Sequence, residues 1–173
     1  MILIEGNLLF DFPDDWQCTK FDDWIFYTNQ FQRIPHLKGV DFLTLDTNNC
    51  IWFIEVKDYR QHPRTKPIEL ADEITQKVIN TLAALLPAKV NANEEQERLL
   101  ASRILRAQRI RVILHLEQPL QHSRLFPKAI DLANVTHQLR QKLKAIDPHP
   151  KVVDTNDMRN ILWNVRENAQ NPA

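Results

Sequence analysis

The segment Lys38–Arg60, KGVDFLTLDTNNCIWFIEVKDYR, decides the fold of this chain. Two apolar runs within it flank the polar connector Thr47-Asn48-Asn49, a pattern that predicts a β-hairpin. If the hairpin is centred on Asn48, residues at equal distances from it lie opposite one another on the two strands. The pairs expected for this register are Leu45 with Ile51, Leu43 with Phe53 and Asp41 with Glu55.

The charged end of this hairpin predicts a site. Opposed residues share one face of a sheet, and Lys57 joins Asp41 and Glu55 there because it lies two residues beyond Glu55. Opposed Cβ atoms lie roughly 4.5–5.5 Å apart, where like charges repel. Two such carboxylates are expected to share a proton or to bind a cation, and Mg²⁺ prefers oxygen ligands. A two-residue loop would instead place Asp41 on the opposite face from Glu55.

At these positions the chain resembles the PD-(D/E)XK nuclease superfamily, which has the restriction-endonuclease-like fold. The superfamily places an acid on one strand and an acid-x-Lys on the next, which Asp41 and Glu55-Val56-Lys57 match; Val40 stands where the motif has proline. The resemblance implies an α/β fold in three layers, with a mixed central sheet flanked by helices. It also implies a nuclease that hydrolyses phosphodiester bonds, of DNA rather than RNA.

By this resemblance Asp41 and Glu55 would hold Mg²⁺, or Mn²⁺ in its place, and Lys57 would position the attacking water. The superfamily also resembles this chain in having a Gln or Lys on the following helix, here Gln76 or Lys77. Gln76 is the first candidate because Lys77 has an alternative partner one turn earlier.

Three alternatives stay open at this stage, and one of them is a Glu55–Lys57 salt bridge without function. The charged residues of the hairpin are also compatible with a hairpin at the edge of the sheet whose open end is solvated. A catalytically inactive domain of the same fold, which binds nucleic acid or a protein partner, is the alternative function. Asp22 and Asp23 are further candidate site residues, although two acids in the first turn of a helix are explained by the helix dipole.

Composition limits the other functions. The chain has 173 residues, 43% of them hydrophobic and 25% charged, which suits one domain, and we expect residues 1–173 to form it. It has two glycines, too few for a Walker-type phosphate loop or a G-x-G-x-x-G fingerprint. Cys18 and Cys50 do not form a C-x-x-C motif, so two buried reduced thiols are expected, with one disulfide as the alternative. The absence of a signal segment and of a long apolar run favours a cytoplasmic protein.

Charge is distributed unevenly although the formal net charge is zero. Residues 1–58 carry ten acids and four bases, whereas residues 101–151 carry ten bases and three acids. An acidic metal-binding half joined to a basic half would suit chemistry on a phosphate backbone, and so nucleic acid, DNA in particular, is the predicted partner. The alternative is that these bases lie on solvated helix faces. A homodimer is left open.

The remaining elements follow from periodicity and from turn residues. Between Phe31 and Arg60 the pattern supplies two strands where the superfamily has three, so the third would come from residues 28–36 or from the 1–12 hairpin. Pro87 is expected to interrupt the helical pattern, and Trp52 and His115 are assigned to the interior. The expected elements are a hairpin at 1–12, helices at 21–31, 68–86, 94–108 and 130–146, strands at 110–116 and 151–153, a short helix at 158–165 and a frayed tail at 167–173.

Overall fold

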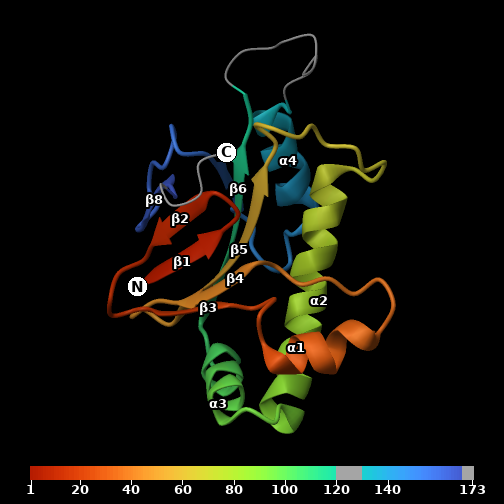
Figure 1. Cartoon of the computed structure of the whole chain (residues 1–173), viewed down its shortest axis with the longest axis vertical. Helices are drawn as coiled ribbons and strands as arrows, with labels where there is room; N and C mark the ends of the chain where they lie inside the picture. Colours follow the sequence, from red (N-terminus) through yellow and green to blue (C-terminus); the bar gives the residue numbers. More distant parts are fainter. Residues whose placement is uncertain (120–129, 169–173) are drawn as a thin grey trace.

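A computed structural model describes residues 1–119 and 130–168 of the chain. Its strands form two sheets, one of five strands and one of three (Figure 1). The five-stranded sheet has the order β3-β4-β5-β6-β7 and the three-stranded sheet has the order β1-β2-β8. The strands are β1 (Ile2–Glu5), β2 (Leu8–Asp11), β3 (Gln17–Lys20), β4 (Phe42–Leu45), β5 (Cys50–Asp58), β6 (Arg109–Glu117), β7 (Lys151–Val153) and β8 (Asn164–Glu167). The helices are α1 (Ile25–Asn29), α2 (Leu70–Asn91), α3 (Glu95–Ile104) and α4 (Leu132–Lys142).

The predicted hairpin forms the centre of the five-stranded sheet. β4 pairs with β5 in the antiparallel sense and brings Leu45 opposite Ile51 and Leu43 opposite Phe53, which confirms the predicted register. Asn49 in the turn has a φ of 54°, a left-handed conformation that Asn tolerates. β5 and β6 are parallel, so a long crossover must join them, and α2 and α3 supply it.

The central sheet lies between the helices on one side and the three-stranded sheet on the other (Figure 1). Successive β5 residues face opposite sides: Phe53 packs in a helix-side core, and Trp52 and Ile54 pack in a small-sheet-side core. Because both faces are covered, β5 is a nearly continuous apolar run instead of an alternating one. The mixed α/β class is thereby confirmed, and within the described residues one flanking layer is a sheet where helices were expected.

Residues Gln17–Lys20 supply the third strand that the sequence did not place. This strand, β3, pairs with β4 and brings Thr19 opposite Leu43. Both predicted sources were wrong: residues 1–12 form a hairpin in the other sheet, and 28–36 contain the end of α1 and a 3-10 turn at Phe31–Arg33. The predicted helix at 21–31 is correspondingly shorter.

Two further boundaries differ from the prediction. α2 continues through Pro87 as far as Asn91, because buried Leu85 and Ala88 on either side of the proline pack into the helix-side core and offset the lost hydrogen bond. The predicted helix at 158–165 is wrong. Its end is instead β8, which pairs with β2 and sets Val165 opposite Phe10.

The remaining predicted elements are present: β7 has the predicted bounds, and α3, β6 and α4 have shifted ends. Cys18 and Cys50 are free and buried, and His115 is buried as expected. In the described part of the chain, none of the helices combines the length and apolarity that a membrane span requires. The end of the predicted tail, 169–173, lies outside the described residues.

Candidate functional site

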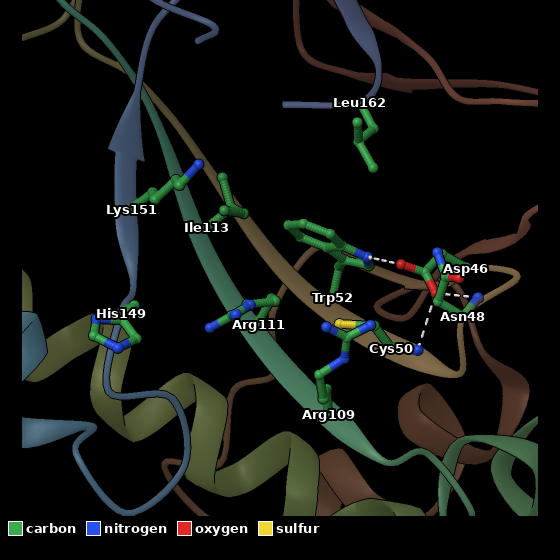
Figure 2. Close-up of a pocket in the computed structure, with 10 residues that line it drawn as sticks. All are labelled: Asp46, Asn48, Cys50, Trp52, Arg109, Arg111, Ile113, His149, Lys151 and Leu162. Carbon is green, nitrogen blue, oxygen red and sulfur yellow. Dashed lines mark hydrogen bonds between the residues drawn. The ribbon is translucent and has the colours of Figure 1, made fainter. Parts of the chain in front are cut away.

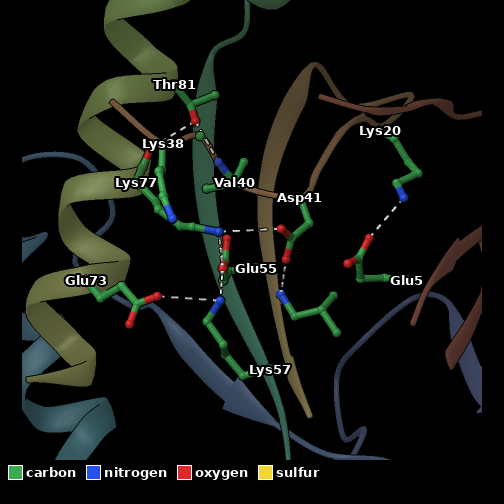
Figure 3. Close-up of polar contacts among 12 residues, drawn as sticks. Glu5, Lys20, Lys38, Val40, Asp41, Glu55, Lys57, Glu73, Lys77 and Thr81 are labelled. Carbon is green, nitrogen blue, oxygen red and sulfur yellow. Dashed lines mark hydrogen bonds and ion pairs between the residues drawn. The ribbon is translucent and has the colours of Figure 1, made fainter. Parts of the chain in front are cut away.

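A buried cluster of charged side chains lies where β5 meets α2 (Figure 3). Glu55 at its centre is 1% exposed, and its Oε1 accepts hydrogen bonds from the ammonium groups of Lys57 and Lys77. Lys77 Nζ also lies 3.5 Å from Asp41 Oδ1. We name Asp41, Glu55, Lys57 and Lys77 the charge cluster.

Backbone contacts fix Asp41 in the charge cluster. Its Oδ2 accepts a hydrogen bond of 2.6 Å from the Val56 amide, and the neighbouring Val40 amide donates to Thr81 Oγ1 on α2 at 2.9 Å. A Cβ at Gly39 would lie 2.6 Å from the ring of Phe21, so this close approach requires glycine. The segment before β4 is therefore held against both the sheet and α2.

Glu73 extends the cluster along α2. It accepts a hydrogen bond from Lys66 Nζ at 2.5 Å, and it lies 3.0 Å from Arg64 Nη2 and 3.7 Å from Lys57 Nζ. These cations hold the pKa of Glu73 below its usual range, although burial acts in the opposite direction. The acids of this region are thus matched by lysine and arginine side chains.

Burial dominates the acid chemistry of Glu55. Desolvation, followed by the negative charge of Asp41, raises the pKa of Glu55 to about 7, against the opposing effect of Lys77 and Lys57. Burial lowers the pKa of Lys57, but the charge of Glu55 outweighs it, so that the pKa of Lys57 is raised. Glu55 can therefore exchange a proton near neutral pH while Lys57 stays charged.

The structure brings three of the four predicted site residues together. Asp41, Glu55 and Lys57 converge, whereas Gln76 donates its amide to Asn80 Oδ1 at 2.8 Å. Lys77, the second candidate on this helix, occupies the place beside Glu55. A polar stripe could have identified it, because Glu73, Lys77 and Thr81 recur every four residues beside the buried apolar residues of the helix.

Asp22 and Asp23 contribute no hydrogen bond or ion pair to the charge cluster among the residues that the structure describes. Burial raises the pKa of Asp22 to about 6, and the charge of Lys20 opposes this shift. The predicted role of either residue in a site is not supported by a contact.

The carboxylates suit Mg²⁺ chemically, and Glu55 Oε2 is buried without a hydrogen-bond partner among the residues that the structure describes. Two ammonium groups, however, already contact Glu55 Oε1. Among residues 1–119 and 130–168, no group of three or more His, Cys, Asp or Glu side chains is arranged to hold a metal ion. Mg²⁺ at Asp41 and Glu55 therefore stays a prediction, since the ion would compete with Lys57 and Lys77.

A second site, not anticipated from the sequence, lies on the opposite face of the central sheet (Figure 2). It is a cavity of about 370 Å³ near the beginnings of β5, β6 and β7. Arg109, Arg111 and Lys151 give it a basic lining, and Ile113 and Leu162 add apolar surface. We name it the basic pocket.

Hydrogen bonds fix Trp52 in the wall of the basic pocket. Its indole Nε1 donates to Asp46 Oδ2 at 3.1 Å, and Asp46 Oδ1 also accepts from the backbone amides of Asn48 and Cys50. The ring of Trp52 stacks on Trp16 with a centroid separation of 5.9 Å. The aromatic wall is thus part of the core, in agreement with the assignment of Trp52 to the interior.

The fold and these two sites define an α/β domain with a charge-compensated cluster on one face of its sheet and a basic pocket on the other. The chain is 30% identical to a cysteine–tRNA ligase of Neisseria meningitidis serogroup A / serotype 4A over an alignment of 174 residues. The match covers 82% of this chain and 24% of the ligase, so the chain spans about a quarter of the relative's length. No family model and no solved structure matches the chain.

This similarity contradicts the predicted nuclease. The relative is named as a tRNA ligase, not as a nuclease or a hydrolase, and so the predicted hydrolysis of phosphodiester bonds was wrong. The structure supplies a physical reason why the motif led to a wrong prediction. The acid and acid-x-Lys positions meet as predicted, but the ammonium groups of Lys77 and Lys57 already neutralise the charge of Glu55. Such a cluster accounts for these residues without catalysis.

Proposed function

We propose that this chain is an RNA-binding domain that acts in a tRNA aminoacylation system and contacts tRNA. The observation that carries the proposal is the 30% identity to a cysteine–tRNA ligase across 82% of this chain. Because the match spans only 24% of the ligase, the proposal concerns binding of the tRNA substrate, not the ligase reaction. RNA thereby replaces DNA as the proposed partner.

Four arginines around the β4–β5 turn support the proposal. Arg103 and Arg106 line a hollow of about 410 Å³ together with Thr47 and Asn49 of that turn. Arg109 and Arg111 lie beside the same turn in the basic pocket. The amide of Gln108 donates to Asn49 O at 2.9 Å, which ties this arginine-rich segment to the turn.

A surface of this kind suits a phosphate backbone. Arginine donates several hydrogen bonds to phosphate oxygens, and neutralised phosphates release counterions, so binding is expected to weaken as salt rises. Five of the ten bases counted between residues 101 and 151 lie in this part of the molecule, namely Arg103, Arg106, Arg109, Arg111 and Lys151. The charge cluster has a structural role in this proposal, because its ion pairs join α2 to the central sheet.

The restriction-endonuclease-like character of the scaffold is a separate proposal. Its support is the placement of Asp41 just before β4 and of Glu55 and Lys57 on the adjacent β5, in a mixed sheet. In this proposal the domain keeps the restriction-endonuclease-like fold and uses it to bind RNA.

The test compares binding of a tRNA transcript with binding of a DNA duplex of similar charge by fluorescence anisotropy over a salt series. We expect tighter binding of tRNA, and we expect Arg103→Gln with Arg106→Gln to reduce the slope of log K against log salt by about 0.7–0.9 for each phosphate that the variant no longer neutralises. Arg140→Gln is the matched control, since Arg140 is exposed on α4, which packs on the helix side of the central sheet.

The proposal fails if tRNA does not bind at low salt. It also fails if the DNA duplex binds as tightly as tRNA, because a general polyanion surface would then explain the arginines.

A further inference from the structure

We infer that the basic pocket binds one unpaired RNA nucleotide, with its phosphate on Arg109 and Lys151 and its base against Ile113, Leu162 and Trp52. This inference rests on the proposed function and names the part of the RNA that the domain recognises.

The size of the cavity limits its occupant. A volume of about 370 Å³ lies at the lower end of the range of roughly 300–1,000 Å³ that is usual for small-molecule sites. A single nucleotide suits this volume, whereas a duplex would have to remain outside. Unpaired nucleotides are the parts of an RNA whose bases can be splayed into a protein pocket.

The cations of the pocket are available to a ligand. Arg109 is exposed and makes no ion pair with any residue in the described ranges. Arg111 Nη1 donates to the fully buried Asp147 at 3.0 Å, which fixes that side chain and leaves further guanidinium donors. Lys151 Nζ donates to Asn160 O at 3.1 Å and retains two donors.

Asp46, the acid in the lining of the pocket, does not pair with these cations. Both oxygens of Asp46 are engaged with the turn and with the indole of Trp52. Figure 2 shows these bonds on the right of the pocket, with Arg109 beside Cys50 and with Arg111 and Lys151 toward the left. A phosphate would therefore meet a region of positive charge, where charge-assisted hydrogen bonds are strong.

The apolar wall provides a place for the base. Leu162 is 59% exposed and projects from the segment before β8 toward Trp52 in Figure 2. Ile113 on β6 also lines the pocket, and the Trp52 ring is immobilised by Asp46 and Trp16. Apolar and aromatic surface beside a cation is the combination that single-stranded RNA sites use for base and phosphate.

The site is tested by isothermal titration calorimetry on the full chain with ribonucleoside 5′-monophosphates, inorganic phosphate and the corresponding nucleosides. We expect a monophosphate to bind at one site and to bind at least roughly tenfold more tightly than phosphate or nucleoside alone, a difference of about 1.4 kcal/mol. We also expect it to compete with tRNA.

Variants assign the binding to the pocket. Arg109→Gln and Leu162→Asp should each weaken monophosphate binding roughly tenfold or more, because they remove a phosphate ligand or place a carboxylate beside the base. Matched controls are Arg140→Gln and Leu86→Asp, where Leu86 is 60% exposed on α2. Since Leu162 is a surface residue, circular dichroism should show that its variant is folded.

Equal affinity for inorganic phosphate and for a ribonucleoside monophosphate would overturn the inference, because the pocket would then be a site for anions without recognition of the base. Tighter binding of an acidic peptide than of a monophosphate would overturn it as well. If tRNA binds but monophosphates do not, or if Arg109→Gln and Leu162→Asp have no effect, the pocket assignment fails while the proposed RNA-binding function stands. Failure of the unaltered chain to bind tRNA would overturn the proposed function itself.

Discussion

Lys77 on α2 and Glu55 on β5 form an ion pair between the helix layer and the central sheet, with side chains that are 12% and 0% exposed. The same oxygen of Glu55 accepts a hydrogen bond from Lys57, and its other oxygen has no hydrogen-bond partner in the described part of the chain. A buried acid therefore depends on two ammonium groups. Because removal of one partner leaves an incompletely compensated charge, this pair should be sensitive to mutation.

Lys77→Met should lower the free energy of unfolding by roughly 3 kcal/mol at pH 8, since it leaves Glu55 with Lys57 as its cationic partner. Urea denaturation followed by circular dichroism measures the change. Lys89→Met is the control, because Lys89 is an exposed lysine on the same helix, and it should change stability by less than about 0.5 kcal/mol. Equal decreases in the two variants would show that the ion pair contributes little.

The raised pKa of Glu55 predicts a specific pH dependence. The folded protein binds this proton more tightly than the unfolded chain, because burial raises the pKa from 4.5 to about 7. The stability that Glu55 contributes is therefore greatest below pH 4.5 and falls as the pH rises to about 7. Relative to Glu55→Gln, the wild-type protein should lose on the order of 3 kcal/mol across this window.

Urea unfolding of both proteins at several pH values measures this difference. The contributions of the acids that both proteins contain cancel in the comparison. A stability difference that stays constant with pH would mean that Glu55 titrates alike in the folded and unfolded states. A difference that grows with pH would mean that its pKa is lowered by the two lysines.

The hairpin could be predicted because its information is local. Apolar residues placed symmetrically about Asn48 fix both the turn and the register, and the register determines that Asp41 and Glu55 share a face. β3 could not be found in this way, since Cys18 is its one buried residue and the strand depends on pairing with β4. The helix interruption predicted at Pro87 was wrong because the burial of Leu85 and Ala88 stabilises the helix by more than the low helix propensity of proline costs.

The basic pocket could not be predicted because no local pattern encodes the register of parallel strands. The β5–β6 pairing brings Cys50 beside Arg109 and Trp52 beside Arg111, although these residues are far apart in the sequence. Leu162 joins them only because the segment before β8 crosses this face. The charge asymmetry indicated a basic region, but the pocket itself required the fold.

Mg²⁺ or Mn²⁺ at Asp41 and Glu55 should bind more tightly when Lys77 is removed, because the ion and the ammonium compete for the same oxygens. We expect Lys77→Met to strengthen Mn²⁺ binding severalfold in isothermal titration calorimetry. Asp41→Asn in the same background should abolish it. Unchanged Mn²⁺ affinity after Asp41→Asn would exclude this pair of carboxylates as the site.

Asp46 organises both the β4–β5 turn and the wall of the basic pocket, and so Asp46→Ala should affect stability and binding together. The substitution removes the acceptor for the amides of Asn48 and Cys50 and for the indole of Trp52. Since Cys50 and Trp52 are buried and an unsatisfied buried donor costs about 1–3 kcal/mol, we expect stability in urea unfolding to fall by roughly 3 kcal/mol. Asp46→Asn keeps one acceptor oxygen and should be less destabilising.

Asp15→Ala is the control for this experiment, because Asp15 is an exposed acid near the same turn and should change stability by less than about 0.5 kcal/mol. Near-ultraviolet circular dichroism should report the release of Trp52 in Asp46→Ala, and monophosphate affinity should fall with it because the aromatic wall is no longer fixed. If the variant unfolds at the wild-type urea concentration and keeps its aromatic spectrum, the indole is held by Trp16 and Trp163 instead, through the ring contacts at 5.9 and 5.4 Å.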